Sequence, residues 1–213
     1  MLETRAPAIS SWKVAEIPGF HAYAVHRDGE VVLIDPVALS PAQEAKLRTL
    51  GTVKAVLLTG PNHERESAAL SKTFGVPVYA HSAAIAQFDS KAVQPLPETL
   101  PLGLVALEAD GAFEGEVVYY HPDDGGSLLV GDSWHNERLA RFPWLARLFI
   151  KHVIRLRDGL HLTPPSKARN SQALIAQSRA WLEQPVERLL VSHGDCLLSG
   201  AGIRMRERLD QGA

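Results

Sequence analysis

AVLLTGPNHERESAALSKTFGVPVYAH, residues Ala55–His81, is the stretch that decides the expected fold. It opens with a short apolar run, Ala55–Leu58, which is typical of a buried strand. A glycine and a proline end that strand, and a helix follows until Gly75, because glycine is favoured just after a helix end. A second apolar run, Val76–Ala80, predicts the next strand. The polar turn Gly60–Glu66 is therefore expected at the carboxyl end of a buried strand, where ligands bind in α/β sheets.

The same stretch resembles the first metal-binding segment of the metallo-β-lactamase superfamily. In that family the turn after the strand reads His-x-His-x-Asp-His. In this sequence the six positions are occupied by Gly60, Pro61, Asn62, His63, Glu64 and Arg65. The frame of the segment is kept, but most of the metal ligands that the resemblance implies are replaced.

Three further segments follow the order of that family. The run VVLIDP ends a predicted strand in Asp35, the segment GEVVYYHPDDGGSLLVGD ends in Asp132, and LLVSHGD contains His193. A helix is predicted from Ser40-Pro41 to about Leu50, since serine caps helices and proline suits their first position. The resemblance implies an α+β fold, a four-layer αββα sandwich in which two mixed sheets are flanked by helices. Without a repeat or an interior linker, residues 1–213 are predicted to form a single domain.

The resemblance also implies which metal ligands remain. Asp132 matches the carboxylate that bridges the two metal ions of the family, and His193 matches its final histidine. Gly60 and Asn62 replace the first two histidines, and the third is expected near Ala112, which offers no donor atom. The first metal position would therefore keep only Asp132, and at most one metal ion is expected.

The second metal position has two interpretations. Glu64 holds the place of an aspartate ligand, so Glu64, Asp132 and His193 could form a triad that suits one Zn, Fe or Mn ion. Against this, Arg65 holds the place of a histidine, and its guanidinium stays protonated. The alternative is that no metal binds and that Arg65 replaces the charge of the ion by pairing with Asp132, Glu64 or both.

The pocket beside these residues is predicted to be lined by Asn62, His63, Arg65 and Trp134. His63 falls at a spacer position of the motif, so it is interpreted as a turn residue that points elsewhere, with movement into the site as the alternative. Trp134 either lines the pocket or packs in the core. Cys196 is the one cysteine of the chain, which excludes an internal disulfide, and it is interpreted as a buried thiol.

Composition limits the partners that we expect. A net charge of −2 and a pI near 6.5 argue against nucleic acid and anionic membranes. The first 17 residues lack the apolar centre of a signal peptide, and a cytoplasmic location is expected. A small-molecule ligand and a homo-oligomer are both compatible with the sequence.

The basic stretch Asn136–Arg157 contains apolar residues at helical spacing and a boundary at Pro143. We interpret it as a helix whose apolar stripe faces the core. The alternative is that it binds an acidic partner.

Three functions remain open. The first is a metallo-β-lactamase-like hydrolase with a depleted site and at most one metal, acting on an ester, thioester, amide or phosphoester. The second is a non-catalytic module that binds a ligand or protein on the same scaffold. The third is a metal-free hydrolase that uses His193 and Asp132 as acid and base. Whether the protein is an enzyme is left open, since a fold does not imply a function.

Overall fold

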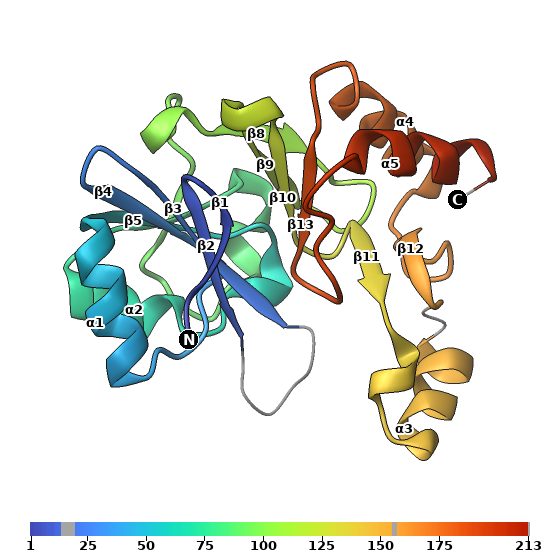
Figure 1. Ribbon diagram of the computed structural model, residues 1–213, viewed down its shortest axis with the longest axis horizontal. Helices are drawn as coiled ribbons and strands as arrows, with labels where there is room; N and C mark the ends of the chain where they lie inside the picture. Colours follow the sequence, from blue (N-terminus) through green and yellow to red (C-terminus); the bar gives the residue numbers. More distant parts are fainter. Residues whose placement is uncertain (14–19, 155–156, 213) are drawn as a thin grey trace.

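The computed structural model describes residues 1–13, 20–154 and 157–212, and Figure 1 shows their arrangement. The first sheet has seven strands in sequence order, antiparallel from β1 to β4 and parallel from β4 to β7. Its strands are β1 (Glu3–Ala6), β2 (Ile9–Lys13), β3 (His21–Arg27), β4 (Glu30–Ile34), β5 (Thr52–Leu57), β6 (Val78–Ala80) and β7 (Val93–Pro95). The sheet is therefore mixed, as predicted.

The second sheet is also mixed. It has the order β13-β10-β9-β8, in which β10 and β13 are parallel and the other neighbours are antiparallel. Its strands are β8 (Val105–Glu108), β9 (Val117–His121), β10 (Ser127–Val130) and β13 (Arg188–Val191). A separate antiparallel ribbon joins β11 (Trp134–Glu137) and β12 (Gly159–Leu162).

Helices cover the outer face of each sheet. Figure 1 shows α1 (Pro41–Leu50) and α2 (Ser67–Phe74) beside the first sheet, and α4 (Ser171–Trp181) and α5 (Ala201–Asp210) beside the second. Successive strand residues face opposite sides, and the buried side chains accordingly form three clusters, one under each helical layer and one between the sheets. This confirms the predicted four-layer αββα sandwich.

Short helical turns complete the described chain. They are η1 (Pro61–His63), η2 (Ser82–Gln87), η3 (Pro101–Gly103), η4 (Asp123–Gly125), η5 (Leu139–Arg141), α3 (Trp144–Phe149) and the π-helical turn η6 (Ile150–Ile154). Among the helices of the described residues, not one has both the length and the apolar character that a membrane crossing requires.

Several ends of helices and strands lie where local sequence signals predict them. α1 begins with the capping box of Ser40 and Gln43, in which each side chain accepts a hydrogen bond from the backbone of the other. α2 ends at Gly75, whose φ of +68° lies in the left-handed region that favours glycine. The loose alternation of apolar and polar residues from Trp12 to Ile17 predicts a strand. The structure confirms this strand as far as Lys13, and the remaining predicted residues lie outside the described ones.

The stretch Asn136–Arg157 differs from the predicted helix. Its beginning belongs to β11, the 3₁₀ turn η5 follows, and the α-helix α3 starts only at Trp144 after Pro143, the boundary that the sequence indicated. The apolar stripe of α3 does not face the core, because the side chains of Trp144 and Phe149 are 67% and 55% exposed. Figure 1 shows α3 at one edge of the molecule, beyond β11 and β12. The expected core-facing stripe was therefore wrong.

Candidate functional site

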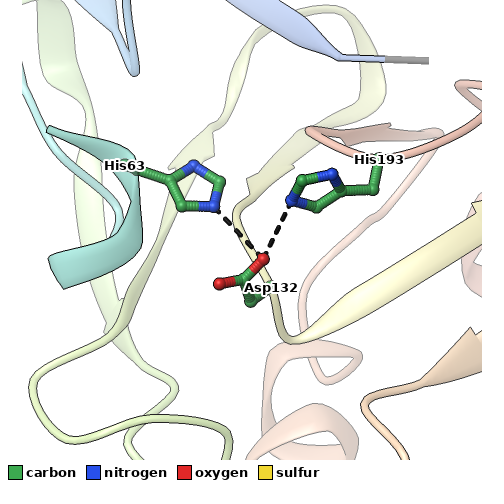
Figure 2. A group of neighbouring side chains, drawn as sticks. All are labelled: His63, Asp132 and His193. Carbon is green, nitrogen blue, oxygen red and sulfur yellow. Dashed lines mark ion pairs between the residues drawn. The ribbon is translucent and has the colours of Figure 1, made fainter. Parts of the chain in front are cut away.

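The candidate site lies where four strands end between the two sheets. Asp35 follows β4 and His63 lies beyond the end of β5, and these strands are parallel neighbours of the first sheet. Asp132 follows β10 and His193 follows β13, which are parallel neighbours of the second sheet. Figure 2 shows His63, Asp132 and His193 pointing toward one another. The two sheets thus contribute to one group of side chains at their carboxyl ends, where the strand positions predicted a site.

Asp132 is the centre of this group. Its Oδ1 atom lies 3.2 Å from His63 Nε2 and 2.9 Å from His193 Nε2. Its other oxygen, Oδ2, accepts a hydrogen bond of 3.0 Å from Asn62 Nδ2. Burial alone would raise the pKa of Asp132, but the positive charge of His63 and the hydrogen bond to His193 hold this pKa well below its usual range. The structure therefore brings together Asp132 and His193, the two ligands that the resemblance retained.

His63 is the third member, and its interpretation as a residue that points elsewhere was wrong. Its ring is buried, and Nδ1 lies 2.7 Å from Asp35 Oδ2. Asp35 also accepts hydrogen bonds from the backbone N–H and the hydroxyl of Thr59, at 2.8 and 2.6 Å. Burial opposes protonation of His63, but the charges of Asp35 and Asp132 raise its pKa to about 10. The reason for the error is local: the turn after Gly60 is the 3₁₀ turn η1, which carries the side chain of its last residue inward.

Glu64 does not belong to the group, so the predicted triad of Glu64, Asp132 and His193 is not formed. The carboxylate of Glu64 accepts hydrogen bonds from the backbone N–H groups of Asp89 and Ser90, both at 2.9 Å. It holds the loop after η2 and is not one of the grouped donors. His63 takes the place that the sequence reasoning gave to Glu64.

Arg65 lines the cavity but does not replace a metal ion. Its Nη1 donates to the backbone carbonyls of His21 and Asp35, at 2.9 and 3.2 Å. Its guanidinium carbon lies 5.5 Å from the centre of the Phe20 ring. Within the described part of the chain it makes no ion pair with Asp132 or Glu64, so the predicted pairing was wrong. Its φ of +42° bends the backbone at this point, which the sequence pattern does not indicate.

Trp134 belongs to the core and does not line the pocket. It is fully buried, and its Nε1 donates to Ser178 Oγ on α4 at 3.0 Å. Ala112, the expected place of a missing histidine, lies in the same core cluster under α4 and α5. Cys196 is half-buried, and its Sγ lies 3.2 Å from Tyr23 Oη.

Glu116 is a residue of the site that the sequence reasoning missed. Its Oε1 accepts hydrogen bonds from the backbone N–H groups of Asp132 and Ser133, at 3.0 and 2.7 Å. Burial and the neighbouring charge of Asp132 raise the pKa of Glu116 well above its usual value. Close by, Gly131 is required because a Cβ atom there would lie 2.3 Å from Thr59 Oγ1. The available signal was an acidic residue directly before an apolar strand.

A cavity of about 430 Å³ opens beside the three donors. Its apolar wall is formed by Phe20, Phe113, Phe142 and Ile150. His135 lies in the wall and stacks on His193 with ring centres 5.4 Å apart, and burial lowers the pKa of His135 to about 3. Glu137 also lines the cavity, and burial raises its pKa to about 7. The cavity therefore combines an apolar wall with a few polar groups, as small-molecule sites do.

The donor set fits a single divalent metal ion. One donor atom from each of His63, Asp132 and His193 lies within 4.8 Å of the others. Donors that bind one ion at ~2 Å are spaced by roughly 3 Å, and Asp132 Oδ1 lies 3.2 Å from the donor atom of His63 and 2.9 Å from that of His193. Nδ1 of His63 is hydrogen-bonded to Asp35, and this leaves Nε2 to face the other donors. Metal-binding histidines usually have such a carboxylate or carbonyl partner on their second ring nitrogen. Two histidines and one carboxylate suit Fe, Mn or Zn with open positions.

Comparisons of sequence and of structure give different results. No protein-family model and no curated protein sequence matches the chain. Among solved structures, a metallo-β-lactamase from Pontibacter korlensis is 14% identical with a TM-score of 0.66, over 100% of this chain and 99% of that one. An archaeal metallo-β-lactamase superfamily protein from Sulfolobus tokodaii is also 14% identical with a TM-score of 0.66, over 97% and 86%.

A third structure, the chemotaxis sensor ODP with a peroxy diiron species, is 12% identical with a TM-score of 0.66, over 99% and 93% of the two chains. At such low identities the likeness concerns the fold. The mixed sheets, the two helical layers and the strand ends that carry the site agree with it. This chain has the metallo-β-lactamase fold.

Proposed function

We propose that this protein is a hydrolase that binds one divalent metal ion through His63 Nε2, Asp132 and His193 Nε2. The observation that supports this most is the convergence of these three donor atoms beside a cavity. A divalent ion bound there would act as a Lewis acid and lower the pKa of a bound water molecule. The depleted site that the sequence indicated is part of this proposal, because only three donors come together among the described residues.

The surrounding residues fix the direction of each donor. Asp35 holds Nδ1 of His63, and Asn62 holds Oδ2 of Asp132. The ring of His193 is held between the edge-on ring of Phe20, with centres 4.6 Å apart, and the stacked ring of His135. Donors that are held in this way need little reorganisation on binding, which favours affinity and activity.

The cavity supports a small substrate with an apolar part. Phe20, Phe113 and Phe142 would contact that part, and the bond to be cleaved would face the three donors. We infer an ester, thioester, amide or phosphoester as the substrate class. Glu137 is suited to take up and return a proton, since it lines the cavity and is largely buried. Its pKa of about 7 is near the value that general acid–base catalysis needs at neutral pH.

Elemental analysis of the purified protein tests the metal site. We expect close to one equivalent of Zn, Fe or Mn in the wild-type protein and a loss of it in Asp132→Asn and His193→Ala. The matched controls are Asp89→Asn and His152→Ala, because both residues are exposed and are not part of the donor group. Equal metal contents in all five proteins would contradict the proposed ligand set.

A metal-free acid–base enzyme is the second candidate, and one observation favours it. Asp35, His63, Asp132 and His193 already form an unbroken series of contacts of 2.7, 3.2 and 2.9 Å. Such a series can orient His193 as a general base. Metal-free protein whose activity on a panel of ester substrates is lost in His193→Ala would support this candidate against the first. Metal-free protein without any activity would contradict both and favour a binding module.

A further inference from the structure

The helical segment that follows Pro143 exposes an unusual set of side chains. Five large apolar residues on α3 and η6 form what we call the α3 face. They are Trp144, Leu145, Leu148, Phe149 and Val153, with exposed fractions of 67, 63, 47, 55 and 61%. Their spacing places them on one side of the helical segment. Figure 1 shows α3 at the edge of the molecule, and contiguous exposed apolar residues of this kind mark an interaction site.

Positive charge surrounds the α3 face. Residues 138–157 contain six Lys and Arg residues and no Asp or Glu. Arg138 and Arg141 are paired with Asp195, at 2.6 and 2.7 Å. Arg147 and Lys151 make no ion pair within the described ranges 1–13, 20–154 and 157–212. The segment therefore presents apolar and cationic side chains together, as helices that lie in a membrane interface do.

A cavity next to the α3 face gathers more of these cations. It has a volume of about 980 Å³, and its lining includes Arg147, Lys151, Arg157 and Arg208 with Asp158 as its one carboxylate among the described residues. Four cations against one carboxylate make the cavity attractive to an anionic group. The cavity lies beside the exposed apolar side chains. An anionic lipid needs this combination, because its headgroup requires cations and its acyl chains require an apolar surface next to them.

We propose that the α3 face docks this protein on the surface of an anionic lipid bilayer. Trp144 and Phe149 enter the boundary between headgroups and acyl chains, and Arg147 and Lys151 contact the phosphates. A second copy of the chain fits this surface less well, since a symmetric contact would bring the same cations together. The overall charge of −2 does not oppose docking, because attraction to a charged surface acts within about 10 Å and depends on the local charge.

This docking does not depend on the proposed hydrolase activity, although the two sites are neighbours. Phe142 and Ile150 from the same segment line the cavity beside the metal donors. Vesicle binding can therefore be measured whether or not the protein carries a metal or turns over a substrate.

The test uses the full chain with vesicles of phosphatidylcholine, with and without about 30% phosphatidylglycerol. Trp12, Trp134 and Trp181 are 1, 0 and 3% exposed, so a change in tryptophan fluorescence reports mainly on Trp144. We expect the protein to sediment with the anionic vesicles and its tryptophan emission to shift to shorter wavelength. Brominated lipid should quench this emission. Phe149→Ala should weaken binding roughly tenfold, and Lys151→Gln should weaken it about fivefold.

Matched controls lie on α5, away from α3 in Figure 1. Ile203→Ala removes an apolar side chain that is 64% exposed, and Arg204→Gln removes an exposed cation. Both controls should bind vesicles like the wild type, and circular dichroism should show that all variants are folded. The proposal is overturned if anionic vesicles are not bound, if neutral vesicles are bound equally well, or if the α3 variants bind like the controls. It is also overturned if soluble glycerophosphate abolishes binding fully, or if the α3 variants only convert a dimer into a monomer.

Discussion

The buried carboxylate of Asp35 offers the most direct test of the site geometry, through the substitution Asp35→Asn. Asp35 is completely buried and accepts three short hydrogen bonds, two from Thr59 and one from His63 Nδ1. An asparagine keeps the shape but replaces Oδ2 with an NH₂ group. The hydroxyl of Thr59 can rotate to accept a hydrogen bond from it, whereas the protonated Nδ1 of His63 cannot. Removing one partner of a buried ion pair in this way costs about 3–5 kcal/mol of unfolding free energy.

Urea unfolding measures this loss, provided that the denaturant dependence is the same in both proteins. Asp123→Asn is the matched control, because Asp123 pairs with Arg27 on the surface and the two side chains are 45% and 35% exposed. That pair should contribute about 0–1 kcal/mol. If metal binds, Asp35→Asn should also weaken its affinity about 10–100-fold, since the partner of a ligand histidine is lost. A loss of unfolding free energy below about 1 kcal/mol, no larger than in the control, would refute the assigned role of Asp35.

Three further changes probe other parts of the structure. Acid should destabilise the protein through His21, because burial lowers its pKa from 6.5 to about 4. The groups that act on His21 besides burial are Lys13, the carbonyl of Gly194, Arg5 and Asp195. Between these two pKa values His21 is protonated in the unfolded chain but not in the folded one. The free energy of unfolding should therefore be about 2 kcal/mol smaller at pH 5 than above pH 6.5. Urea midpoints near pH 7.5 and 5 check this, and an equal fall in His21→Gln would contradict it. Gly131→Ala should cost about 1–3 kcal/mol, since its Cβ would meet Thr59 Oγ1; an unchanged urea midpoint would show that the loop adapts. Glu64→Gln should keep the metal content of the wild type, whereas elemental analysis showing its loss would return Glu64 to the ligand set.

The individual strands and helices were predictable because their signals are local, whereas their four-layer arrangement was implied by the family resemblance. The apolar runs before Asp35 and Thr59 indicated β4 and β5, and Ser40 before a proline indicated the start of α1. The resemblance assigned Asp132 and His193 to one site, and both follow apolar runs. In the structure these runs are β10 and β13, which are parallel neighbours, so their ends meet at one edge of the second sheet. The family pattern could therefore place both residues in the same site without any knowledge of side-chain directions.

The other donor could not be assigned in the same way. Which residue of the Gly60–Glu66 turn faces Asp132 depends on the backbone angles of the turn. His63 ends the 3₁₀ turn η1 with its side chain buried, and Glu64 binds the loop after η2. The positive φ of Arg65 follows directly after them. The α3 face was misjudged for a related reason. A helical apolar stripe indicates that one side will be covered, but the sequence does not show whether the covering partner is the chain's own core.

The site depends on how the two sheets are held together, because each sheet contributes only part of the donor group. Two tyrosines connect the sheets close to the donors. Tyr23 on β3 donates its hydroxyl to the carbonyl of Val191 at 2.6 Å, and Tyr119 on β9 donates to the carbonyl of Leu58 at 2.8 Å. Both carbonyls belong to residues that lie at the ends of site-bearing strands, just before the turns that carry His193 and His63. The distance between the two histidines is thus controlled by hydrogen bonds across the sandwich. This gives a physical reason why a few donors, contributed by segments far apart in the chain, can keep the close spacing that one ion requires.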